Sequence, residues 1–196
     1  MSRSAEQRTA RRAQAHAVTR SAILDAARRV AARDDGREFS LRGVAAEAGF
    51  VPAALYGYFG GKDDLLLALA ADDLSHLARA MREASRGDDK GKLAAASAAA
   101  LSMLHGAQSI SGALGALPGA GTSEAERLFN GRMIAALKVL SEASGSDAAT
   151  RDGQCDVVLT AAAVMGLAML ARSGRLAALG FRTDEILARL DARFSN

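Results

Sequence analysis

One short segment brings together residue types that could bind the phosphates and grooves of DNA. Gly49 and Pro52 punctuate a turn, Tyr56 and Tyr58 follow, and Lys62 comes four residues after the second tyrosine. Glycine permits the positive φ of a sharp turn, and proline suits the first residue of a helix, where its missing N–H costs nothing. Hydroxyl and ammonium groups such as those that follow commonly contact DNA phosphates.

The flanking residues complete the pattern of a helix-turn-helix. Ser40 is a preferred N-cap before a helix over about 41–48, and the small Ala45 lets a second helix cross the first closely. The segment from Pro52 to Tyr58 is then the helix presented to the major groove, ending near Phe59. Apolar residues fill the expected inward positions: Val44, Ala48, Phe50, Leu55 and Tyr58.

The composition predicts an all-α protein. Hydrophobic residues make up 49% of the 196 residues, aromatic residues only 4%, and two prolines interrupt the chain. Ala, Leu and Arg, which are abundant here, favour helices. Cys155 is the only cysteine, so a disulfide framework and a cysteine-based metal cluster are excluded, and we expect it to be a small core residue.

Charge is distributed unevenly along the chain. Residues 1–62 hold eleven Lys and Arg against six Asp and Glu, whereas residues 63–196 hold fourteen against sixteen. This favours a polyanion-binding N-terminal part, with a solvated basic tail as the alternative. Residues 1–18 lack apolar periodicity, which predicts a flexible arm that could enter a minor groove and read A·T-rich flanks by shape. The arginines available for this are Arg8, Arg11, Arg12 and Arg20.

The C-terminal two thirds show helical periodicity throughout. The segment Val157 to Ala171 is apolar but too short and too rich in alanine to span a membrane, so we expect a buried helix and a cytoplasmic protein. Its small residues, with an amphipathic last helix capped by Thr183, predict a homodimer through the last two helices. That last helix would offer Ile186, Leu187, Leu190 and Phe194. The predicted helices cover about 62–85, 93–104, 123–144, 155–173 and 183–194.

No constellation for catalysis or metal binding stands out. His16, His76 and His105 lie far apart, and none pairs with a carboxylate at metal-ligand or triad spacing. The pair Asp72–Asp73 has the pattern of solvated charges. We therefore expect no enzyme, no metal site and no cofactor.

Several methionines and polar residues of the C-terminal helices are candidates for a pocket that takes a small apolar or amphipathic ligand. Methionine fills irregular gaps and adaptable pockets, although each one is also an ordinary core residue. The candidates are Met103, His105, Gln108, Asn130, Met133, Met165 and Met169.

From about Thr19 to Leu66 the chain resembles the DNA-binding domain of TetR-family transcriptional regulators. The similarity lies in "ILDAARRVAA", in "FSLRGVAAEAGF" and above all in "LYGYFGGKDDLL". The resemblance implies that Ser40 and Lys62 meet phosphates and that the two tyrosines pack the small domain and reach the DNA backbone. The DNA-binding candidates are Ser40, Arg42, Val51, Pro52, Ala53, Tyr56, Tyr58 and Lys62.

This chain departs from the family pattern at three positions of the motif. Val51 stands where a capping Ser or Thr is usual, Gly57 where a large side chain is common, and Gly61 where a capping Ser precedes the lysine. The recognition helix therefore has no Arg, Asn, Gln or Lys to read base edges, and we expect few direct hydrogen bonds to bases.

These features predict three parts: a basic arm at 1–18, a helix-turn-helix domain of three helices at 19–66, and a helical ligand-binding and dimerisation domain at 67–196. The expected function is a sequence-specific repressor that binds a double-stranded operator and is released by a small molecule. The alternative is a ligand-independent architectural or scaffold protein that binds DNA through backbone contacts.

Overall fold

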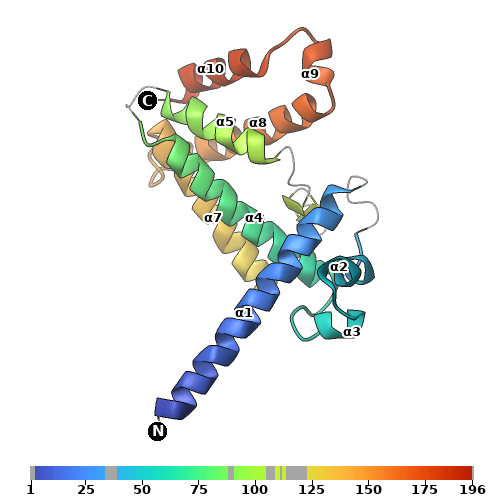
Figure 1. Cartoon of the computed structure of the whole chain (residues 1–196). Helices are drawn as coiled ribbons and strands as arrows, with labels where there is room; N and C mark the ends of the chain where they lie inside the picture. The colour runs from blue at the N-terminus through green and yellow to red at the C-terminus, as the bar shows by residue number, and fades with distance from the viewer. Residues whose placement is uncertain are drawn as a thin grey trace.

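The computed structural model has an all-α fold, as expected, in which a small N-terminal unit is joined to a larger helical bundle (Figure 1). It describes residues 3–33, 39–87, 91–104, 109–110, 112–113 and 123–195, which form helices and turns without a strand. The helices are α1 (Arg3–Ala32), α2 (Leu41–Ala48), α3 (Pro52–Leu55), α4 (Lys62–Ala84), α5 (Lys92–Leu104), α7 (Glu124–Ser144), α8 (Arg151–Arg172), α9 (Arg175–Ala178) and α10 (Thr183–Phe194).

The N-terminal unit has its own apolar core, built where α1, α2 and α3 meet the first turns of α4. Ile23, Val44, Leu55 and Leu65 have no exposed surface, and Phe59 is also buried there. Because α4 continues from this core into that of the bundle, one helix belongs to both.

The N-terminal segment differs from the expected flexible arm. Residues 3–18 are the first turns of α1, which runs for 30 residues and projects beyond the body (Figure 1). Helix propensity explains this, because residues 1–33 contain neither Gly nor Pro and are rich in Ala and Arg. The buried second half of α1 supplies the nucleus from which the solvated half extends.

The bundle packs α4 chiefly against α7 and α5, with α8 and α10 closing its far end. Capping fixes the start of α7, where the Ser123 hydroxyl accepts from the Glu126 N–H and the Glu126 carboxylate accepts from the Ser123 N–H. The last helix begins as expected, but Arg182 rather than Thr183 is its N-cap residue. Its apolar residues were expected to face a partner and instead pack on the core of their own subunit: Ile186, Leu187, Leu190 and Phe194.

The apolar helix α8 is not buried as expected. It begins earlier than predicted, with Thr150 as N-cap, and is long and apolar enough in composition to cross a membrane. Only 28% of its most apolar window is buried, and Val158, Leu159 and Met169 lie on the surface. Cys155, expected in the core, is exposed on the same helix. A single subunit therefore leaves one face of α8 uncovered.

Candidate nucleic-acid interface

The turn between α2 and α3 is fixed by local hydrogen bonds. Ser40 caps α2, with its hydroxyl accepting from the Gly43 N–H at 3.1 Å. Gly49 ends α2 at φ 75°, a left-handed conformation that favours glycine. The Phe50 N–H then donates to the Ala45 carbonyl at 2.8 Å, which closes the turn. Val51 offers no side-chain cap, and Pro52 follows at the first helical position, as expected.

The helix that follows is shorter than predicted. It ends at Leu55 rather than near Phe59, and residues 56–58 form a turn in which the Tyr58 and Phe59 N–H groups both donate to the Leu55 carbonyl at 2.9 Å. Phe50, expected to point inward, is on the surface. Leu55 is fully buried, so it anchors the short helix and leaves the opposite side free.

The residues expected to bind DNA share the exposed surface of this unit. Val51 is 68% exposed and Tyr56 63% exposed, so the first turn of α3 and the residue after it present their side chains to solvent. Tyr58 differs, because it is half-buried against the N-terminal core. The remaining exposed candidates are Ser40, Arg42, Pro52, Ala53 and Lys62.

Aromatic contacts join α1 to the end of this motif. The ring of His16 stacks on that of Tyr58, with centroids 4.5 Å apart and planes 25° apart. One turn further along α1, the guanidinium carbon of Arg20 lies 5.1 Å from the centre of the Phe59 ring. These contacts fix the direction in which the solvated half of α1 leaves the motif.

A ridge of basic residues continues from those contacts toward the N-terminus. Arg8, Arg12, His16 and Arg20 are spaced four residues apart, so they form one row along the helix. His16 and Arg20 touch the motif, and Arg8 and Arg12 extend the row into solvent. The row therefore begins beside the candidate interface and leads away from it.

Ion pairs hold α2 on α1. The Glu47 carboxylate accepts from Arg29 at 2.7 Å and from Arg33 at 2.8 Å. Hydrogen bonds from these two guanidinium groups hold the pKa of Glu47 below its ordinary value.

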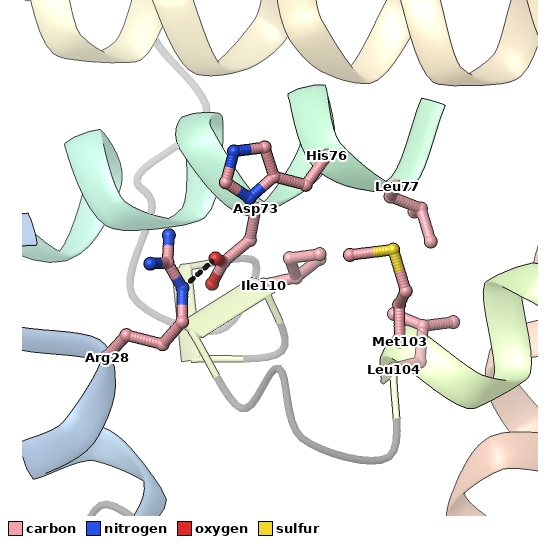
Figure 2. A pocket seen from close by; sticks show the side chains of 7 residues that line it. All are labelled: Arg28, Asp73, His76, Leu77, Met103, Leu104 and Ile110. Carbon is pink, nitrogen blue, oxygen red and sulfur yellow. Dashed lines mark hydrogen bonds and ion pairs between the residues drawn. The ribbon is translucent and has the colours of Figure 1, made fainter. Parts of the chain in front are cut away.

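The sequence reasoning missed a second polar cluster, which lies where α1 crosses α4. Asp72 and Asp73 were expected to be solvated, but Asp73 is only 6% exposed. Arg28 donates to Asp73 at 2.8 Å (Figure 2). It also donates to Asp72 at 2.7 Å, and the Ser109 hydroxyl donates to Asp73. Burial disfavours the charge on Arg28, but its bonds and charge attraction with Asp73 and Asp72 outweigh this and raise its pKa.

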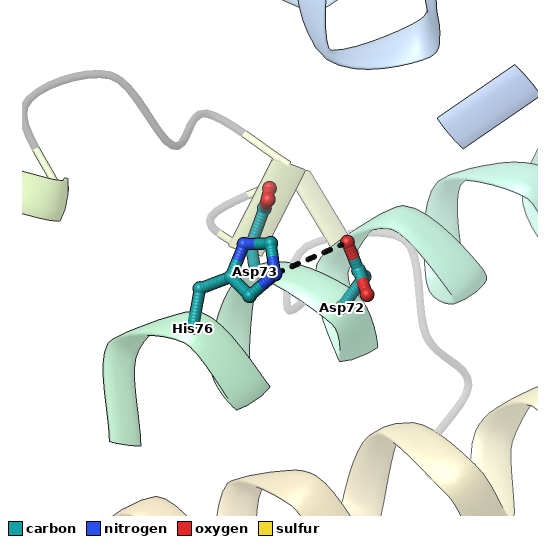
Figure 3. Close-up of side chains that lie close together, drawn as sticks. All are labelled: Asp72, Asp73 and His76. Carbon is teal, nitrogen blue, oxygen red and sulfur yellow. Dashed lines mark ion pairs between the residues drawn. The ribbon is translucent and has the colours of Figure 1, made fainter. Parts of the chain in front are cut away.

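His76 was expected to have no carboxylate at ligand spacing, and this is wrong. Its Nε2 lies 3.9 Å from an Asp72 carboxylate oxygen, and potential ligand atoms of Asp72, Asp73 and His76 lie within 4.8 Å of one another (Figure 3). The Arg28 guanidinium already binds both carboxylates, so a cation would have to compete with it.

Two cavities adjoin this cluster inside the bundle. A cavity of about 260 Å³ is lined by Arg28, Asp73, His76 and four apolar side chains (Figure 2). A second, of about 120 Å³, is lined by apolar side chains of α4, α5, α7 and α8 together with Ile110.

The ligand-binding candidates divide between these cavities and the surface. Met103 lines the larger cavity, and Met133 and Met165 line the smaller one. Met169 is 60% exposed, and Asn130 lines neither cavity. His105 and Gln108 lie outside the described residues.

Comparison with known proteins finds a family match for the N-terminal unit. Residues 23–69 match the sequence profile described as bacterial regulatory proteins, tetR family. No curated protein matches the chain.

Solved structures share the fold over nearly the whole chain. A protein of unknown function from Rhodococcus sp. RHA1 is 27% identical, with a TM-score of 0.67 over 90% of this chain and 93% of that one. The transcriptional regulator FadR from Bacillus subtilis, solved in complex with stearoyl-CoA, is 18% identical, with a TM-score of 0.63 over 90% of this chain and 97% of that one. The fatty acid degradation regulator FadR from Bacillus halodurans is 15% identical, with a TM-score of 0.62 over the same shares.

Proposed function

We propose that this chain, a DNA-binding regulator with a TetR-family helix-turn-helix domain at residues 23–69, is a cytoplasmic homodimeric repressor released from its operator by a small molecule. The observation that carries the proposal is the α2–turn–α3 geometry. Gly49 turns the chain, Leu55 anchors α3 in the core, and the first turn of α3 remains exposed. That is the arrangement with which a helix enters a major groove.

The exposed groups suggest which residues contact the DNA phosphates and which contact the bases. Lys62, at the start of α4, and Ser40, at the start of α2, are assigned to phosphates, with Arg42 and Tyr56 beside them. Val51, Pro52 and Ala53 offer only apolar contact, for which the partner in the major groove is the thymine methyl group. Affinity then comes mainly from the backbone, and sequence preference from methyl contact and DNA shape.

The helical form of residues 3–18 changes the proposed role of the N-terminal segment. An α-helix with its side chains is about 10–12 Å wide, whereas the minor groove of B-DNA is about 6 Å wide. The segment therefore does not enter the minor groove as an extended arm would. Instead, we assign the row containing Arg8 and Arg12 to phosphates flanking the half-site that the α3 helix occupies.

The uncovered face of α8 supports a homodimer. Val158, Leu159 and Met169 are each more than half exposed, and the first two line a largely apolar groove of about 900 Å³ between α7 and α8. Large exposed apolar patches on soluble proteins mark interaction surfaces. A two-fold contact across α8 would cover this face and set two α3 helices apart at a fixed distance.

Binding-site selection from random duplex DNA, followed by footprinting of the selected sites, tests the proposal. A repressor of this kind should protect discrete near-palindromic sites. The centres of the two half-sites should lie about one helical turn of DNA apart, or a multiple of it. The small molecule should then weaken this protection. Diffuse coating without a preferred sequence would contradict the proposal and favour an architectural protein.

A further inference from the structure

Two neighbouring cavities lie behind the DNA-binding unit, one with an apolar lining and one with polar groups. They share the wall residues Leu77, Leu104 and Ile110, so they adjoin each other. The smaller cavity, called the inner cavity below, has an entirely apolar lining among the described residues. The larger one, called the outer cavity, is also lined by Arg28, Asp73 and His76. Pockets of this type, apolar with a few placed polar groups, bind small ligands and orient them by the polar end.

Among the described residues, carboxylates outnumber guanidinium groups around that polar end. One guanidinium, that of Arg28, donates to three carboxylates at 2.7–2.8 Å: Asp25, Asp72 and Asp73. Only Asp73 of the three lines the cavity, and it is buried. From the described residues, its oxygens accept one bond each from Arg28 and Ser109. Since a carboxylate offers about four lone-pair sites, Asp73 retains room to accept another donor.

We propose that the two cavities act as one site and bind a compact ligand with an apolar body and a protonated amine head group. The body would fill the inner cavity, and the ammonium would donate to Asp73 in the outer one. Amine and carboxylate would form a charge-assisted hydrogen bond, whereas an anionic head group would meet three carboxylates that share one guanidinium. The proposal rests on the proposed function only in taking this ligand to be the one that controls DNA binding.

The position of Asp73 supplies the link to DNA. An ammonium on Asp73 would share that carboxylate with Arg28 and weaken the ion pair, and Arg28 belongs to the helix whose His16 and Arg20 touch the DNA-binding motif. The ligand and the DNA-bound arrangement would therefore act on the same ion pair. A coupling of this kind is reciprocal, so operator DNA should weaken amine binding by the factor by which the amine weakens DNA binding.

The experiment compares three probes of equal chain length, n-octylamine, n-octanol and n-octanoate, on the full chain by calorimetry near pH 7. An alkylamine is protonated there, as lysine is. We expect octylamine to bind at least roughly tenfold more tightly than octanol, and octanoate most weakly. Octanoate binding as tightly as octylamine would overturn the proposal, and so would octylamine binding no more tightly than octanol.

A matched pair of variants locates the site. Asp73→Asn should abolish the preference for octylamine over octanol, while Asp72→Asn, whose residue binds Arg28 but does not line the cavity, should retain it. Equal losses in both variants would overturn the assignment to Asp73. If Asp73→Asn fails to fold, the comparison of the three probes on the wild type still decides. Failure to bind any DNA would instead refute the proposed function and leave the amine measurement unaffected.

Discussion

Replacing Gly166 by arginine should separate the proposed dimer without damaging the subunit. Gly166 lies within α8, and a Cβ added there would meet no atom within 4 Å. Arginine also favours a helix more than glycine does, by roughly 0.7–1 kcal/mol. The isolated subunit should therefore tolerate the change, and any penalty must come from a neighbouring molecule.

The exposed fractions on α8 give the size of the effect. Fully burying a Val, Leu or Met side chain is worth about 1.5–3 kcal/mol. Because Val158, Leu159 and Met169 are 58%, 56% and 60% exposed, covering them contributes about 1 kcal/mol each, or about 6 kcal/mol over two subunits. Association itself costs an estimated 4–15 kcal/mol, so these side chains alone leave little net free energy in favour of the dimer. Burying two arginines, at several kcal/mol each, should raise the dimer dissociation constant by more than about a hundredfold.

Sedimentation equilibrium at micromolar concentration measures this directly, with Gly166→Ala as the matched control. Alanine brings the same gain in helix propensity but little bulk, so that variant should stay dimeric. The arginine variant should be monomeric, retain its thermal unfolding transition and lose operator affinity, because one subunit reads only one half-site. A dimeric Gly166→Arg protein, or a wild type that is monomeric at this concentration, would refute the assignment of α8.

Three further predictions concern the DNA surface. Lys62→Ala should weaken binding to all DNA sequences alike, since a phosphate contact carries no base information. It should also lower the slope of log binding constant against log salt concentration by about 1 per subunit. A changed sequence preference with an unchanged slope would contradict this. Deleting residues 1–18 should lower the slope by roughly 2 or 3 per subunit through the lost arginines while leaving the dimer intact; loss of an A·T flank preference with an unchanged slope would instead favour minor-groove entry. Gly57→Arg should raise overall DNA affinity in a filter or anisotropy assay, because Gly57 is exposed next to Tyr56 and a Cβ there meets only the Ala54 carbonyl oxygen at 3.4 Å. Weaker binding by a folded variant would count against a place for this residue on the DNA side.

Local signals in the sequence predicted the helix-turn-helix correctly. Ser40, Gly49 and Pro52 act through their own backbone neighbourhoods, so their residue types suffice to place the cap, the turn and the helix start. The solvated half of α1 was missed because we read the lack of apolar periodicity as disorder. Propensity and an anchored continuation form that helix without an apolar face.

The polar cluster where α1 crosses α4 could not be predicted from local signals in the sequence. Arg28 and Asp73 are 45 residues apart, and only the crossing of α1 over α4 brings them together. A weak indication was present, since "LALAADDLSHLA" sets two aspartates inside an apolar helix and Arg28 interrupts an apolar stretch of α1. Charges at such positions are rarely left unpaired, so each should have suggested a partner of opposite sign.

The course of α4 explains why a pocket in the bundle can influence a surface that reads DNA. Lys62 begins this helix at the DNA side, Asp73 lies eleven residues further along at the junction, and Leu77 lines both cavities. At 1.5 Å per residue, about 16 Å of continuous helix separates the proposed phosphate contact from the carboxylate. A packed helix moves largely as a unit, so a displacement at Asp73 is carried to Lys62 rather than absorbed between them. In the proposed complex the first turn of α3 makes only apolar contacts, so binding would rest on many phosphate contacts made together by two subunits. Such a surface would be sensitive to small changes in the separation of the subunits.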